Sequence, residues 1–148
     1  NTIPGSATLV LNCRFYDDDV KARTYAAIER VVRGECIASG CEKEPTFTYS
    51  NHGELTDNSP EVFSKVRPLF DAVFDDASVD AQRWTASEDF SEVPRAFGAP
   101  YFFWLIGANS DDADAPGNHM PHFLPDYEPV VSASNRAALA AVLAYLAV

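Results

Sequence analysis

Two of the chain's three histidines, His119 and His122, lie in one short loop and are the residues best suited to bind a metal ion. The loop, residues 118–123, follows an apolar run over 101–107. A histidine directly after a buried strand, on a loop restrained by proline, is well placed to bind a metal. Pro121 argues against a pair of ligands on one helical face. The alternative is a solvated loop with incidental histidines, which these residues by themselves favour.

Other charged side chains could contact a substrate or transfer protons. Glu88 and Asp89 follow Ser87 and could bind a metal, act as general acid or base, or lie in the first turn of a helix, which is the commonest of these roles. Arg14, beside Asn12, could bind a substrate carboxylate in bidentate fashion, or form a salt bridge with one of the chain's own carboxylates. Taken alone, these residues favour the salt bridge.

Composition restricts the class of protein. The chain has 148 residues, 47% of them apolar, which is enough for one ordinary domain with a core. A net charge of −11 argues against nucleic acid or an anionic membrane as a partner. No apolar run approaches the roughly 18 residues that span a bilayer. Three cysteines without a CxxC spacing indicate free thiols in a reducing compartment, so we expect a cytoplasmic protein.

Hydrophobic periodicity predicts alternating strands and helices, and therefore an α/β fold with helices on the faces of a layered sheet. The polar stretch 51–58 is predicted to link two structural units. The predicted strands cover 7–15, 45–50, 78–84 and 101–106. The predicted helices cover 20–39, a segment starting at Ser59-Pro60, a short helix capped by Ser87 and ending near Ala96, and a last helix capped by Ser134.

In such a sheet, binding residues gather at strand ends. Residues 87–89 follow one predicted strand and His119 follows the next. We therefore expect these two strand ends to meet at one pocket.

Several short segments, in order, resemble the C-terminal part of the zinc-dependent amidohydrolase and metallopeptidase family that includes hippurate hydrolase, aminoacylase and carboxypeptidase G. The resembling segments are Asn1-Thr2-Ile3-Pro4, Leu11-Asn12-Cys13-Arg14, Ser87-Glu88-Asp89-Phe90-Ser91, Pro100-Tyr101-Phe102, Leu105-Ile106-Gly107 and His119-Met120-Pro121-His122-Phe123. The resemblance implies hydrolysis of the amide bond of N-acyl amino acids or related small amides by metal-activated water. The implied cofactor is a divalent metal, zinc first, with one or two ions and with manganese or cobalt as alternatives.

The resemblance also implies roles for single residues. His119 matches the family's last metal-ligating histidine, in preference to His122. Asn1 and Arg14 match residues that hold the substrate, and Ser87, Glu88 and Asp89 match a segment of the active-site wall that faces the substrate.

By the same resemblance, residues 1–58 are the second half of a β-α-β-β-α-β lid domain that forms a homodimer, and residues 59–148 are the end of the catalytic domain. The other metal ligands and the catalytic glutamate of the family precede Asn1. We therefore expect a fragment of a longer enzyme that contains no catalytic residue of its own and is inactive alone. The alternatives are a non-catalytic interaction and dimerisation module, or a small subunit completed by another polypeptide.

Overall fold

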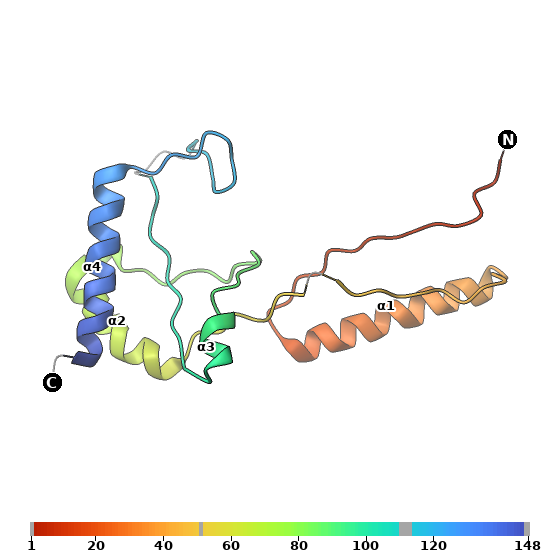
Figure 1. Cartoon of the computed structure of the whole chain (residues 1–148), viewed down its shortest axis with the longest axis horizontal. Helices are drawn as coiled ribbons and strands as arrows, with labels where there is room; N and C mark the ends of the chain where they lie inside the picture. Colours follow the sequence, from red (N-terminus) through yellow and green to blue (C-terminus); the bar gives the residue numbers. More distant parts are fainter. Residues whose placement is uncertain (1, 51, 110–113, 147–148) are drawn as a thin grey trace. The chain divides into compact units, whose positions relative to one another are not determined.

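The computed structural model describes residues 2–50, 52–109 and 114–146, which form two compact units (Figure 1). The first unit comprises Asn1–Leu55 together with Arg83–Asp89, and the second comprises Thr56–Gln82 and Phe90–Val148. The segment Arg83–Asp89 therefore belongs with the N-terminal part of the chain, from which it is distant in sequence.

The predicted α/β fold is wrong, because the described residues contain helices and no β-strand. In chain order the elements are α1 (Asp18–Ala38), α2 (Pro60–Phe74), the 3₁₀ turn η1 (Asp75–Ala77), α3 (Glu92–Ala96) and α4 (Tyr127–Leu146). The four predicted strands are extended connections without a hydrogen-bonded ladder, so neither a layered sheet nor a β-α-β lid is formed by this part of the chain.

Residues 101–106 illustrate why the strand prediction failed. Phe102, Trp104 and Ile106 pack against the core of the second unit, while the rings of Tyr101 and Phe103 lie 5.9 and 5.2 Å from that of Phe90. The side chains thus alternate as in a strand. The backbone of Phe103, however, is hydrogen-bonded to a side chain and not to a neighbouring strand.

The side-chain amide of Asn58 bridges this extended segment. Its Oδ1 accepts from Phe103 N at 2.6 Å, and its Nδ2 donates to Phe103 O at 2.8 Å. A neighbouring strand would make this same pair of hydrogen bonds. One amide side chain therefore satisfies the N–H and C=O of Phe103, within the apolar run that predicted a strand.

α1 is a helix because its ends carry strong local signals. The Asp17 side chain accepts from Val20 N at 2.8 Å, and Asp18 and Asp19 place negative charge in the first turn. Gly40, with φ of 66°, follows the C-terminus. The helix predicted over 20–39 is confirmed with small shifts at both ends. None of its residues is buried.

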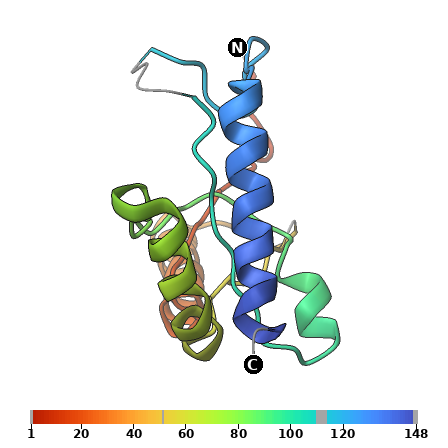
Figure 2. The ribbon, with the colours of Figure 1, turned by 90° about the vertical axis from the view of Figure 1, so that its left-hand side faces the viewer.

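The core of the second unit lies between α2 and α4, which pack side by side (Figure 2). Its buried members are Val66 and Phe70 from α2 and Ala137 and Ala140 from α4. The small alanine side chains allow the two helix backbones to approach closely. The predicted start of α2 is confirmed, because the Ser59 side chain accepts from Val62 N at 3.4 Å.

Two predicted helix caps are wrong. Ser134 lies inside α4 and not before it, and its Oγ donates to Val130 O at 2.7 Å. A serine that bonds the carbonyl one turn earlier is tolerated within a helix, so it does not have to begin one. Ser87 precedes α3, whose N-cap is Ser91.

α4 is long and apolar enough to cross a membrane, with a mean hydropathy of 1.2. Core helices of soluble proteins meet the same criteria, and Ala137 and Ala140 of α4 are buried in the core shared with α2. The cytoplasmic location and the absence of a membrane partner stay predictions.

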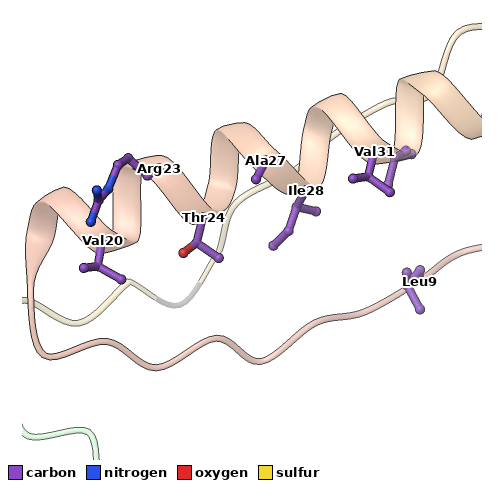
Figure 3. Close-up of a pocket in the computed structure, with 8 residues that line it drawn as sticks. Leu9, Val20, Arg23, Thr24, Ala27, Ile28 and Val31 are labelled. Carbon is purple, nitrogen blue, oxygen red and sulfur yellow. The ribbon is translucent and has the colours of Figure 1, made fainter.

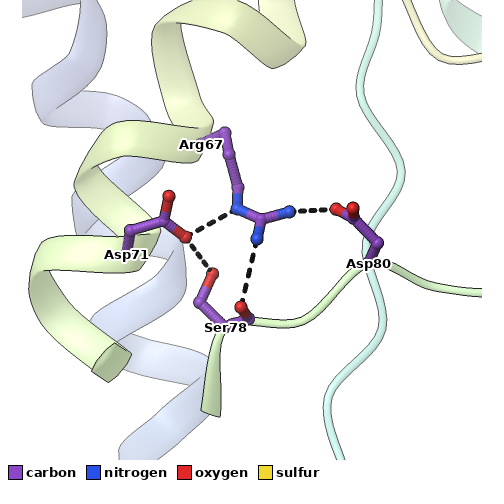
Figure 4. Close-up of polar contacts among 4 residues, drawn as sticks. All are labelled: Arg67, Asp71, Ser78 and Asp80. Atoms are coloured by element: carbon purple, nitrogen blue, oxygen red, sulfur yellow. Dashed lines mark hydrogen bonds and ion pairs between the residues drawn. The ribbon is translucent and has the colours of Figure 1, made fainter. Parts of the chain in front are cut away.

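A polar cluster ties the end of α2 to the segment after η1 (Figure 4). Arg67 Nε donates to Asp71 Oδ1 at 2.6 Å and Nη2 donates to Ser78 O at 3.1 Å, while Nη1 bonds Asp80. Ser78 Oγ donates to the same Asp71 oxygen at 2.7 Å. The Ser78 hydrogen bond, and next the Arg67 bond, hold the pKa of Asp71 below its usual range.

This cluster predicts an acid-dependent loss of stability. Because the pKa of Asp71 is lower in the folded than in the unfolded state, its stabilisation is complete above the unfolded pKa of about 4 and disappears as the pH falls through the folded pKa. Asp71→Asn should therefore lower the urea midpoint at neutral pH, and the difference from the unmodified chain should shrink as the pH falls below about 4.

Asp76→Asn provides the matched control, since Asp76 is an exposed aspartate in the neighbouring η1 turn. Urea midpoints that depend on pH in the same way for both variants would contradict this role of Asp71.

Candidate functional site

Arg14 lies on the extended segment before α1, in the first unit. Its Nη1 donates to Thr85 O at 2.5 Å, and its Nε donates to Asn12 Oδ1 at 3.2 Å. The side chain is exposed. The salt bridge predicted as the default is not the contact found here, because the guanidinium binds a backbone carbonyl and an amide.

A second contact lies next to the first. Tyr16 OH approaches Arg83 O at 3.5 Å, and the guanidinium of Arg83 lies 5.9 Å from the centre of the Tyr16 ring. Tyr16 lies two residues after Arg14, whereas its partner Arg83 lies two residues before Thr85, the partner of Arg14. The two extended segments therefore run antiparallel and are joined by side chains.

The predicted substrate-facing residues Ser87, Glu88 and Asp89 belong to this same unit. Ser87 and Asp89 are exposed, while Glu88 is half-buried and its Oε1 accepts from Asp89 N at 3.0 Å. The alternative that Glu88 and Asp89 are first-turn acids is wrong, since the acid in the first turn of α3 is Glu92. The structure thus brings Arg14 and residues 87–89 into one unit, with Thr85 as the point of contact.

His119 is the third residue of a four-residue turn in the second unit, closed by a hydrogen bond from Met120 N to Gly117 O at 3.2 Å. Its φ is 66°, and among the described residues only Asp75 is another non-glycine with positive φ. This conformation costs an L-residue about 1 kcal/mol, and such strain is concentrated at functional positions. His119 is exposed and therefore accessible to a ligand.

A metal centre is not complete within the described part of the chain, where no group of three metal-ligating side chains is found. His119 and His122 are both exposed. Asn1, predicted to contact the substrate, lies outside the described residues. The assignment of His119 as a metal ligand, with further ligands from other residues, stays a prediction.

An open apolar groove of about 580 Å³ lies between α1 and Leu9, within the first unit (Figure 3). It is lined by Leu9, Val20, Arg23, Thr24, Ala27, Ile28, Val31 and Val32. One apolar stripe of α1 forms its wall. Because Leu9 is 75% exposed and Val31 58% exposed, this face can accept an apolar partner.

His52 is exposed, but it is not isolated. Its Nε2 lies 3.0 Å from Lys21 Nζ and 3.0 Å from Glu54 Oε1. These contacts connect the first turn of α1 with residues 52–54 of the same unit.

The contacts that sequence reasoning missed involve backbone carbonyls. Thr85 and Arg83 contribute their carbonyl oxygens, which every residue type carries. A single sequence therefore contained no signal for them.

A scan against models of known protein families finds no match to this chain. The likeness to the amidohydrolase family therefore rests on the short segments quoted from the sequence.

Proposed function

We propose that this chain is part of a metal-dependent amidohydrolase that cleaves the amide bond of N-acyl amino acids or related small amides. The contact between Arg14 and Thr85 carries the proposal. It joins the family-like segment 11–14 to Thr85, a residue 71 positions from Arg14 in the sequence and two positions before the family-like segment 87–91, within one unit. The resemblance assigns both segments to the substrate, and this contact, which places them close together in one unit, supports a common site.

Arg14 is the group that binds the substrate's carboxylate. A guanidinium carries five N–H donors in a planar fork, and two of them are used by Thr85 O and Asn12 Oδ1. The remaining three can bind a carboxylate. The same two hydrogen bonds hold the guanidinium in place before the substrate arrives, which lowers the entropic cost of binding.

His119 is the residue of this chain that holds the metal, through a ring nitrogen of the neutral imidazole. A catalytic zinc needs about three protein ligands and one open position, so further ligands come from residues outside this chain. Bound zinc, or manganese or cobalt in its place, supplies a Lewis acid for the amide carbonyl and lowers the pKa of water. Residues 87–89, which lie in the first unit with Arg14, face the substrate.

A second candidate function is a non-catalytic interaction module, or the homodimer expected through residues 1–58. The open apolar groove on α1 favours it, since α1 has no buried residue and exposed apolar side chains bind partners readily. The two candidates differ in one result: only the first gives amide hydrolysis by the metal-loaded protein.

Arg14→Ala tests the proposed enzyme. We expect kcat/KM for an N-acyl amino acid to fall by about a hundredfold, mainly through KM, because one partner of a charge-assisted pair is lost. An analogue whose carboxylate is blocked as an amide should be turned over equally by both proteins. The assay measures release of the amino acid by the purified protein that contains this chain, supplied with zinc.

Tyr16→Phe is the matched control, because it removes the neighbouring contact to Arg83 O and leaves the charge of Arg14 in place. Its kcat/KM should stay within about twofold of the unmodified protein. Equal turnover of the carboxylate substrate by the Arg14→Ala variant would remove the proposed role of Arg14. No hydrolysis with zinc, manganese or cobalt would leave the interaction module as the function.

A further inference from the structure

The C-terminus of α1 is closed by a motif that places two cysteines together. Gly40 N donates to Ile37 O at 3.2 Å, and Cys41 N donates to Cys36 O at 2.9 Å. With Gly40 at φ of 66°, these two bonds form a Schellman motif. The backbones of Cys36 and Cys41 are therefore held against each other.

In this motif the residue two positions beyond the helix cap contacts the third residue from its end, usually through apolar side chains. Here both positions are cysteine. Cys36 is half-buried and Cys41 is exposed, and both are free thiols. A disulfide requires two Cα atoms within about 7 Å, a condition that a backbone hydrogen bond between the two residues meets.

The two thiols also differ in their surroundings. Desolvation raises the pKa of Cys36, as do its hydrogen bond to Cys41 and the negative charges of Glu44 and Glu35. Cys36 therefore keeps its proton to a higher pH than an ordinary thiol. Cys41, which is open to solvent, is the sulfur that a dissolved oxidant reaches first.

We propose that Cys36 and Cys41 form a redox pair that closes into a disulfide when the protein meets a peroxide. The Cys41 thiolate attacks hydrogen peroxide, its O–O bond breaks, hydroxide leaves, and a sulfenic acid forms on Cys41. The Cys36 sulfur then attacks the sulfenic sulfur. An S–S bond forms, the S–O bond breaks, and the departing hydroxide takes up the thiol proton and leaves as water.

In sum, two thiols are oxidised and one peroxide is reduced to two molecules of water. A thiol reductant such as glutathione reverses the step by exchange. In the oxidised form the disulfide covalently links the last turn of α1 to the residue that follows Gly40. Cys13 lies on the extended segment before α1 and has no part in the motif.

The test treats the full chain with stoichiometric hydrogen peroxide in native buffer and maps the products by mass spectrometry. We expect a species lighter by two hydrogen atoms that yields a linked Cys36–Cys41 peptide. Cys13→Ser should give the same product at the same rate. Cys36→Ser should give none, and should leave a sulfenic acid on Cys41 that dimedone traps.

The role of the helix cap is tested separately by the rate of closure. We expect the linked peptide to form about tenfold faster in native buffer than in denaturant, because the folded motif raises the effective concentration of one thiol at the other. Gly40→Val, which puts a branched side chain at a positive φ, should slow closure to a similar degree. Equal rates in native buffer and in denaturant, or a disulfide to Cys13, would overturn the proposal.

Discussion

Replacing His119 by glycine is expected to lower the turnover of the metal-loaded protein by about a thousandfold, because a lost ligand leaves the metal weakly held. Glycine is the most informative substitution at this position. It removes the imidazole while suiting the φ of 66°, so the turn from Gly117 to Met120 is kept. The relief of strain at this φ and the greater entropy of glycine in the unfolded chain oppose each other, so the stability of the fold should be about unchanged.

His122→Ala is the matched control, since His122 is a second exposed histidine in the same loop. Metal content after dialysis, zinc affinity by competition with a chelator, and kcat are measured for both variants. The His122 variant should retain zinc and stay within about threefold of the unmodified kcat. If the His119 variant kept its zinc and its turnover, His119 would not be a ligand.

The second large effect concerns stability. Phe70→Ala is expected to lower the free energy of unfolding of the second unit by about 3–5 kcal/mol. Phe70 is 8% exposed, and its ring centre lies 5.5 Å from that of Trp104, 6.0 Å from Phe102 and 6.1 Å from Phe74. Truncation would leave a cavity between α2, α4 and the extended segment, lined by rings that cannot collapse into it.

Phe97→Ala deletes the same atoms where they are 83% exposed, and should change the free energy of unfolding by less than about 0.5 kcal/mol. Urea unfolding followed by tryptophan fluorescence measures both variants, since Trp104 lies against the ring of Phe70. Similar midpoints for the two variants would mean that Phe70 is not central to a packed core in solution.

Helix starts could be predicted where the signal is local. Asp17 and Ser59 each accept a hydrogen bond from an N–H three residues ahead, so the pattern that predicts the cap contains all the atoms that form it. Gly40 could be predicted for the same reason, since only its own φ is involved. The start of α4 could not be predicted in this way, because the Ser134 hydroxyl forms its hydrogen bond within the helix and does not cap it.

Strands could not be predicted in the same way, because a strand is defined by its neighbour. Alternation specifies an extended backbone with two faces, and residues 101–106 do show two faces. Whether the backbone then joins a ladder depends on which groups reach it. Here the amide of Asn58, 45 residues away from Phe103 in the sequence, takes the place of a strand.

The same distinction between local and long-range signals applies to the candidate site. Residue types alone identified Arg14, Glu88, Asp89 and the two histidines His119 and His122 as groups able to bind a carboxylate or a metal, because that ability belongs to the side chain itself. The family resemblance added Ser87 and the choice of His119. Tertiary structure alone joined Arg14 to Thr85, which lies 71 residues away in the sequence. The groups that a side chain can bind are set by its residue type and can therefore be predicted from the sequence. Which residues lie close together depends here on contacts to backbone atoms, which all residues share, and is decided only when the chain folds.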